Sequence, residues 1–421
     1  MRDPPSIVTA LLLMLSCLSH NVVASDTSTR PGIQAGCKHA VFGSPALLYS
    51  GGRIEGPSTP TTTATAAACR ALRAGASAAL VPQSPQQPPT TSASSNSSTS
   101  GLRHRTKVLG YFGLWYALNV WYNVVNKKVL NALPLPSSVA VLQLGIGSLW
   151  VGTQWLLGLR TPPGVLTSEG AARLTPVAFF HGGGQLATVL SLGAGAVSFT
   201  HVVKALEPFF SALVAAVWFH QVFRWQVYAS LVPVVAGVSL ACAKEINFSW
   251  VSFLAAMASN LLFVCRSNFS KALMTRPPFR DGATTSSANL YGLVTVMSFA
   301  VFAPWAAVTE WAKWAPAWES AVEKSSGRGD KLALSVVLSG IFHYLNNEVM
   351  YLALGSVHPT TLAVGNTMKR VFLVVASLIV FKTPISRMGM VGSAIGIGGV
   401  LFYSLARQHY GEVERSTAKQ Q

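Results

Sequence analysis

Residues 198–219 read SFTHVVKALEPFFSALVAAVWF, an apolar run whose charged side chains are Lys204 and Glu207. Its length matches the roughly 20 residues that an α-helix needs to cross the hydrocarbon core of a bilayer. A cation at membrane depth costs at least about 2.5–3.5 kcal/mol on insertion scales, so it normally faces a water-filled cavity rather than lipid. The stretch therefore predicts a transmembrane helix that carries part of a polar site.

The composition of the whole chain is that of a membrane protein. Of the 421 residues, 11% are charged and 50% are hydrophobic, and the mean hydropathy is +0.42, whereas a soluble domain usually carries about 25% charged residues. The net charge of +17 forms no dense basic run and no basic patch interleaved with aromatic residues, so we expect no nucleic-acid partner. The five cysteines show no disulfide framework and no CxxC spacing, and we expect no metal and no cofactor.

Ten apolar stretches of about transmembrane length follow Lys107. Their approximate bounds are 108–126, 138–158, 174–193, 198–219, 226–243, 249–269, 289–309, 332–353, 358–381 and 388–406. Residues 197–240 resemble residues 357–401, with VSFT at 197–200 over VHPT at 357–360. Two halves of five helices must have inverted topology, because an odd number of crossings reverses the second half.

We therefore predict an all-α polytopic membrane protein of ten transmembrane helices, arranged as two inverted repeats of five. Such repeats place a substrate site between them, at the membrane midplane. Chance similarity between apolar segments is the alternative explanation of the repeat.

Three cations lie well away from the ends of these apolar stretches. Lys204 is six residues into the fourth stretch, and Lys369 and Arg370 lie midway through the ninth. Corresponding helices of the two halves would bring the three charges to one pocket, and the planar fork of an arginine suits phosphate as the ligand. The alternatives are an intrahelical pair of Lys204 with Glu207, which we expect to orient Lys204 in either case, and snorkelling of Lys369 and Arg370 to the membrane interface.

Further polar side chains inside the stretches could line a pocket or join helices. They are Gln185, Thr188, Asn260, His343, Tyr344, Asn346, Asn347 and Glu348. Arg266 closes the sixth stretch, which favours anchoring at the membrane interface, and His181 beside three glycines favours a packing role. The charged connection around 310–330 is expected to be a solvated link or a surface helix.

Four segments resemble the plastid phosphate translocators, the triose-phosphate/phosphate and related antiporters of the drug/metabolite transporter superfamily. They are NVWYNVVNKK at 119–128, AVSFTHVVKALEPFF at 196–210, ASNLLFVCRSNFSK at 258–271 and VGNTMKRVF at 364–372. The resemblance covers roughly 107–407 and implies exchange of a phosphorylated metabolite for inorganic phosphate, without covalent chemistry. It also implies that Thr188, Lys204, Lys369 and Arg370 hold the phosphate.

Two positions depart from the triose-phosphate members of that family. Those members read the organic end of the substrate with a histidine where this chain has Gln185, and with a tyrosine where it has Asn346. We predict that Gln185, Asn346 and His343 contact the organic group of the substrate, and that Glu207 supports the phosphate-binding residues. The substrate stays open among triose phosphate, 3-phosphoglycerate, phosphoenolpyruvate, pentose phosphate and hexose phosphate, because VGNTMKR and KALEPFF resemble different subgroups.

The first hundred residues have the composition of targeting sequences. A short apolar region at 7–18 follows Arg2, and the stretch after it is rich in Ser, Thr, Ala, Pro and Gly. We assign 1–25 as a signal peptide, 26–105 as a transit-peptide-like disordered presequence, 106–407 as the ten-helix transporter domain and 408–421 as a polar C-terminal tail. This order resembles the presequences of algae with complex plastids, which are reached through the endoplasmic reticulum; a signal anchor with a lumenal tail is the alternative.

Two rival functions follow from the same residues. A nucleotide-sugar transporter of the endoplasmic reticulum or Golgi has the same superfamily fold and fits a signal anchor. An intramembrane enzyme is not expected, because neither H-E-x-x-H nor G-x-S-x-G nor a pair of intramembrane carboxylates occurs. The membrane lipids, phosphorylated metabolites and inorganic phosphate are the expected partners, and the oligomeric state stays open.

Overall fold

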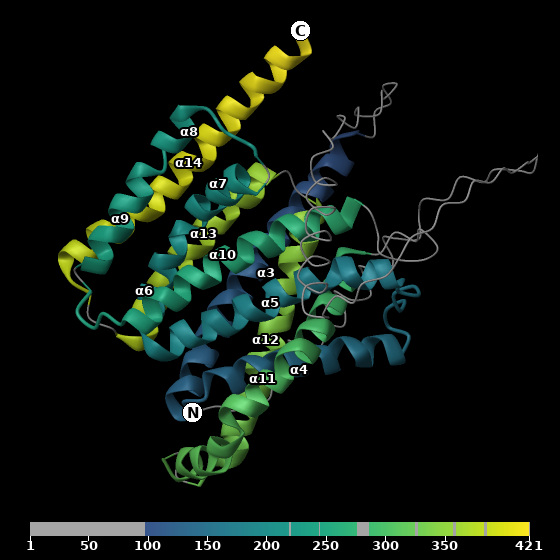
Figure 1. The fold of residues 1–421 in the computed structure, drawn as a ribbon, viewed down its shortest axis with the longest axis vertical. Helices are drawn as coiled ribbons and strands as arrows, with labels where there is room; N and C mark the ends of the chain where they lie inside the picture. Colours follow the sequence, from purple (N-terminus) through teal and green to yellow (C-terminus); the bar gives the residue numbers. More distant parts are fainter. Residues whose placement is uncertain are drawn as a thin grey trace, which may run out of the picture. The chain divides into compact units, whose positions relative to one another are not determined.

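The computed structural model describes residues 97–218, 220–243, 245–275, 286–324, 327–356, 359–382 and 385–420. The predicted signal peptide at 1–25 and most of the predicted presequence at 26–105 lie outside these residues. The described part of the chain is built from helices and contains no strand (Figure 1). The packing reported below lies within residues 97–152 and 163–420.

The helices follow the apolar stretches along the chain. They are α3 (Ser97–Ala132), α4 (Pro136–Leu156), α5 (Ser168–Ala194), α6 (Val197–Val203), the 3₁₀ turn η1 (Lys204–Leu206), α7 (Glu207–Val217), α8 (Trp225–Ala229), α9 (Val232–Ala243), α10 (Trp250–Thr275), α11 (Ser287–Lys324), α12 (Gly329–Ser356), α13 (Pro359–Phe381) and α14 (Arg387–Gln420). Residues 97–105 are thus helical, although the sequence analysis assigns them to the presequence, and α14 continues through the C-terminal tail.

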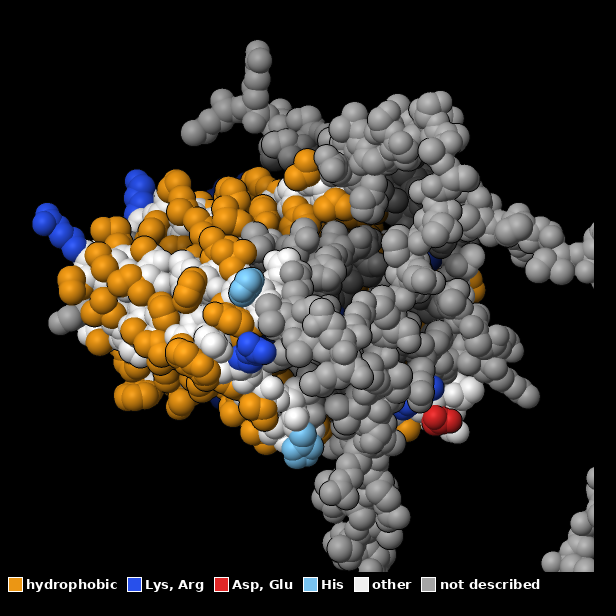
Figure 2. Space-filling view, turned by 90° about the horizontal axis from the view of Figure 1, so that it is seen from above, with side chains coloured by type: hydrophobic (Ala, Val, Ile, Leu, Met, Phe, Trp, Pro, Cys, Tyr) orange, Lys and Arg blue, Asp and Glu red, His pale blue; other side chains and the backbone are white. Residues whose placement is uncertain are grey.

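Among the described residues, six helical segments are long and apolar enough to cross a membrane. They are Pro136–Leu156, Val197–Val217, Trp225–Ala243, Trp250–Lys271, Ser287–Lys324 and Arg387–Gly411. Large apolar side chains such as Val308 and Ile379 lie on the outside of the protein, and hydrophobic side chains cover most of the described surface seen in Figure 2. An all-helical chain with several such segments and an apolar exterior is a polytopic membrane protein.

The helices pack in pairs that are distant in sequence. α5 packs against α10 and α11, α3 against α12 and α13, and α9 against α14 (Figure 1). At the α9–α14 contact a side chain at Gly237 would collide with the backbone of Gly392 and Gly396. Small residues let the backbones of two membrane helices approach closely, and the glycines serve that purpose here.

The connection around 310–330 agrees with the prediction of a surface helix over most of its length, since Lys313, Glu319 and Glu323 are exposed, but Glu310 is an exception. α11 continues through it to Lys324, and Glu310 is 8% exposed. The Glu310 carboxylate accepts hydrogen bonds from the backbone N–H groups of Ser137 (3.1 Å) and Ser138 (2.7 Å), in the first turn of α4. The first N–H groups of a helix lack intrahelical partners and favour a negative charge, so Glu310 fastens α11 to the start of α4.

Candidate functional site

Lys204 lies at a break between α6 and α7, and Pro208 explains the break. Proline has no N–H with which to reach the carbonyl oxygen of Lys204, so the Glu207 N–H bonds that oxygen instead and forms the 3₁₀ turn η1. The carbonyl of Val203, which would otherwise accept from Glu207, accepts from Asn260 Nδ2 of α10 at 3.1 Å. Asn260 therefore joins two helices and stabilises the backbone turn that presents Lys204.

The Lys204 ammonium is held by two hydroxyl groups from neighbouring helices. Its Nζ donates to Thr188 Oγ1 of α5 at 3.1 Å and to Ser259 Oγ of α10 at 2.5 Å, and it lies 4.7 Å from the ring centroid of Phe263. The structure thus brings Lys204 and Thr188 together, as the resemblance implies. Sequence reasoning missed Ser259, although Ser259, Phe263 and Arg266 are spaced i, i+4 and i+7 and so share one face of α10.

Arg370 of α13 forms an ion pair with Glu207, at the start of α7. Arg370 is 5% exposed, whereas the Glu207 side chain is 33% exposed. The expectation from the sequence is that Glu207 orients Lys204; in the structure its carboxylate pairs with Arg370. The buried position of Arg370 also argues against snorkelling to the membrane interface.

Lys369, the neighbour of Arg370, points to α3. Its Nζ lies 4.3 Å from the ring centroid of Trp115, which is 1% exposed. A desolvated cation over an indole ring gains about 2 kcal/mol. The three predicted cations therefore have three different internal partners, namely a pair of hydroxyls, a carboxylate and an aromatic ring.

Gln185 belongs to a buried amide network beside this cluster. Its Nε2 donates to Tyr122 Oη at 2.8 Å and to Gln143 Oε1 at 2.6 Å. Gln143 in turn donates to Asn126 Oδ1 at 2.8 Å and to Ser339 Oγ at 3.2 Å. Both N–H groups of Gln185 are thus engaged with α3 and α4.

Asn346 of α12 is tied to α3 by a row of asparagines. Asn119 Nδ2 donates to Asn346 Oδ1, Asn123 Nδ2 donates to Asn119 O at 2.8 Å, and His201 Nε2 lies 2.9 Å from Asn123 Oδ1. The asparagines of the segment 119–128 lie at i, i+4 and i+7 and therefore share one face of α3. This row of asparagines connects Asn346, which is predicted to contact the organic group, with α6, the helix that precedes Lys204.

His343 is buried among aromatic rings. It is 1% exposed, and its ring centroid lies 5.8 Å from that of His181 and 5.5 Å from that of Tyr122. Neither ring nitrogen of His343 has a hydrogen-bond partner within the described part of the chain. His343 thus lies within the helix bundle, next to the Gln185 network through Tyr122.

Arg266 is a fourth interior cation, and its assignment to the membrane interface is wrong. It is 7% exposed, its Nη1 lies 3.1 Å from His181 Nδ1, and it donates to Asn347 Oδ1 at 3.2 Å. Its guanidinium carbon lies 4.6 Å from the ring centroid of Phe263, the ring that Lys204 also contacts. His181 is expected to have a packing role, but it also contacts the guanidinium of Arg266, which α10 directs into the interior.

The interior of this polytopic helical membrane protein holds a cluster of cations and hydroxyls. Such a cluster is typical of membrane transporters for polar, anionic solutes. Within the described residues, no group of three or more His, Cys, Asp or Glu side chains could hold a metal ion. Residues 106–404 match the Triose-phosphate Transporter family, and the chain belongs to this family. It is therefore a transporter and not an enzyme, and the resemblance to the plastid phosphate translocators is confirmed.

Several curated relatives cover most of the same region. The chain is 39% identical over 305 residues to the chloroplastic glucose-6-phosphate/phosphate translocator 2 of Arabidopsis thaliana, covering 72% of this chain and 76% of the relative. It is 37% identical to phosphoenolpyruvate/phosphate translocator 2 from the same plant, covering 72% and 77%. It is 36% identical to the xylulose 5-phosphate/phosphate translocator of that plant, covering 72% and 71%.

Proposed function

We propose that the protein is an antiporter that exchanges a phosphorylated C3, C5 or C6 metabolite for inorganic phosphate across a plastid envelope membrane. The names of its relatives, which are translocators of glucose 6-phosphate, phosphoenolpyruvate and xylulose 5-phosphate in exchange for phosphate, support this function over nucleotide-sugar transport. The observation that carries the proposal is the position of Lys204, held between Thr188 and Ser259 beside the Glu207–Arg370 pair.

In this proposal the phosphate oxygens bind to Thr188, Lys204, Lys369 and Arg370. An ammonium has three donors, and Lys204 uses two of them on hydroxyls, so one remains for phosphate. Arg370 has an Nε that lacks a hydrogen-bond partner in the described residues, so its guanidinium keeps donor capacity beyond the bond to Glu207. A planar guanidinium binds two phosphate oxygens side by side, whereas a lysine binds as a point charge.

Obligatory exchange follows from the charges in the site. Glu207 pairs with Arg370, whereas Lys204 and Lys369 contact uncharged groups, so an empty pocket retains uncompensated positive charge that resists removal from water. Bound phosphate neutralises this charge and permits the occluded intermediate through which the two halves of the protein alternate. The empty transporter should therefore reorient slowly, and the loaded one quickly.

The finer topology is part of the same proposal: ten transmembrane helices in two inverted repeats of five. The ten apolar stretches overlap helices of the described chain, with the broken α6–η1–α7 segment at the fourth and the pair α8 and α9 at the fifth. The proposed repeat-related helices also pack against each other, α6 against α13 and α9 against α14. Elements near a two-fold pseudo-axis meet their counterparts in this way.

We further propose that residues 1–25 and 26–105 direct the protein through the endoplasmic reticulum to a complex plastid. A fluorescent protein fused after residues 1–105 should reach the plastid of an alga of that kind, and removal of 1–25 should leave it in the cytosol. Retention of the full fusion in the endoplasmic reticulum or Golgi would contradict this route.

The function is tested by counter-exchange in liposomes that contain the purified protein. Labelled phosphate should enter vesicles loaded with phosphate or with a phosphorylated C3, C5 or C6 compound, and should not enter empty vesicles. Competition by a nucleoside monophosphate without competition by phosphate would instead identify a nucleotide-sugar transporter.

A further inference from the structure

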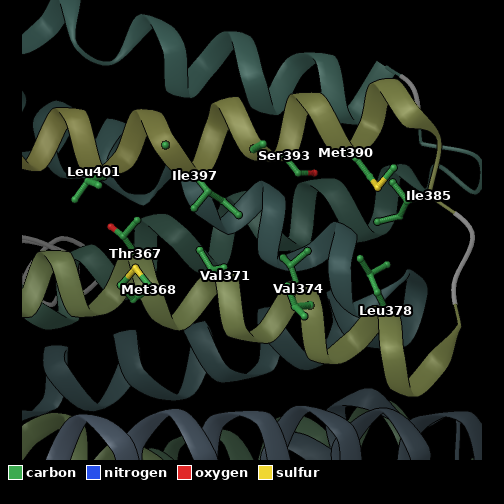
Figure 3. Close-up of a pocket in the computed structure, with 13 residues that line it drawn as sticks. Thr367, Met368, Val371, Val374, Leu378, Ile385, Met390, Ser393, Ile397 and Leu401 are labelled. Carbon is green, nitrogen blue, oxygen red and sulfur yellow. The ribbon is translucent and has the colours of Figure 1, made fainter. Parts of the chain in front are cut away.

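An open apolar groove runs between α13 and α14 (Figure 3). Its volume is about 420 Å³. Met368, Val371, Val375 and Leu378 line it from α13, and residues of α14 such as Ile397 face them. Several lining side chains are open to the surroundings, because Met390 is 51% and Val375 49% exposed.

The groove and the phosphate site use different faces of α13. Met368 and Val371, which flank the two cations in sequence, line the groove. Lys369 and Arg370 are turned inward, to Trp115 and Glu207. Since Met368 and Val375 are exposed in the apolar lining while Lys369 and Arg370 have interior partners, the groove faces the lipid rather than the transport pathway.

The length of the groove fits one leaflet of a bilayer. On α13 it extends from Thr367 to Leu378, which corresponds to a helical rise of about 16 Å. Half of a hydrocarbon core of about 30 Å is about 15 Å. The groove therefore spans the depth over which a single acyl chain of one leaflet lies.

One end of the groove carries positive charge. Lys382 and Arg387 are exposed and lie next to the lining residues Leu378 and Ile385. They are the only charged residues in the sequence 371–406, which contains no acid. Arg387 also begins α14, so the positive end of the helix dipole lies at the same end of the groove.

We propose that the α13–α14 groove binds an acyl chain of an anionic phospholipid whose head group contacts Lys382 and Arg387. The apolar lining takes the chain, and the two cations select the charge of the head group. A second copy of this chain fits less well, because a two-fold interface at this groove would place the same cations of both copies at the same side and depth of the membrane. This proposal concerns binding and does not rest on the transported substrate.

The test uses the full-length protein in vesicles that contain phosphatidylglycerol or phosphatidylcholine with a photoreactive group at the end of one acyl chain. We expect phosphatidylglycerol to label the protein more strongly than phosphatidylcholine does. The labelled peptides should lie around Thr367 on α13 and Leu401 on α14, at the end of the groove away from Lys382 and Arg387. In the Lys382→Gln/Arg387→Gln double variant, the ratio of labelling by phosphatidylglycerol to labelling by phosphatidylcholine should fall by about 30-fold. This corresponds to about 2 kcal/mol for two cations. The double variant Lys313→Gln/Lys331→Gln, which removes two exposed lysines elsewhere, is the control.

A second variant fills the groove without changing its charge. Gly398 lines the groove, and a Cβ added there meets no atom within 4 Å, so the side chain of Gly398→Leu can leave the backbone into open space. It should abolish labelling at the groove, whereas Gly110→Leu, at another exposed helical glycine with open space around it, should not. Equal labelling by the two lipids, or labelling unchanged in both groove variants, would overturn the proposal. Cross-linking of two copies through α13 and α14 would overturn it in favour of a dimer interface.

Discussion

The substitution Arg370→Lys separates the charge of Arg370 from its shape. Lysine keeps the positive charge and can still pair with Glu207, but it loses the planar fork that binds two oxygens at once. A hydrogen bond to a charged group contributes about 1.5–3 kcal/mol. The loss of one such bond to phosphate therefore predicts an affinity lower by about 10- to 150-fold.

The assay is phosphate homoexchange in liposomes, measured over a range of external phosphate concentrations. Because Arg370 is 5% exposed and its partner is Glu207, a conserved charge should preserve the fold, which size-exclusion chromatography checks. Arg407→Lys is the matched control, since Arg407 is an arginine of α14 whose guanidinium lies 4.9 Å from the ring centroid of Phe223. A half-saturation concentration equal to that of the parent would refute the proposal that the fork of Arg370 binds phosphate.

Three further predictions follow from the contacts of the site and of the scaffold. Ser259→Ala removes one of the two hydroxyls that hold the Lys204 ammonium in position. If Lys204 then loses its bond to phosphate, phosphate affinity in homoexchange should fall by about 10-fold, as for one bond to a charged group. Unchanged affinity would exclude Ser259 from the site. The double change Gln185→His/Asn346→Tyr should leave phosphate homoexchange largely intact and shift competition profiles toward C3 phosphates. The reason is that the larger tyrosine ring at position 346 leaves less room for the organic group of the substrate. Superimposable profiles of parent and variant would show that neither residue selects the substrate. Glu310→Ala leaves the first N–H groups of α4 without their acceptor and should lower the free energy of unfolding by about 1–3 kcal/mol, visible as a lower melting temperature; an unchanged melting temperature would contradict the stabilising role of this contact.

Much of the membrane architecture was predictable from local sequence. Apolar stretches such as 198–219 read as membrane helices because hydropathy and length are properties of neighbouring residues. The position of Lys204 at a helix break also has a local cause, since Pro208 lies four residues after it. Lys369 and Arg370 were recognisable as interior cations because uncharged residues surround them on both sides.

The partners of these side chains were not predictable in the same way. Glu207 lies three residues from Lys204 in sequence, yet it pairs with Arg370, which is 163 positions away. Arg266 and Glu310 lie near the ends of apolar stretches and read as interfacial or solvated groups, but helix packing buries both. A one-dimensional pattern contains no information on how a helix is rotated about its axis against a distant neighbour.

The sequence by itself therefore determined the class of protein, the approximate membrane segments and three of the interior cations, but not Arg266. Tertiary structure alone decided which group neutralises which cation, that Ser259 and Thr188 share Lys204, and that Asn346 is tied to α3 through Asn119. The physical reason is that the transfer of a segment from water into the membrane depends on the composition of that segment. A hydrogen bond or ion pair instead requires two atoms at a defined distance and angle. That geometry exists only after the helices have packed.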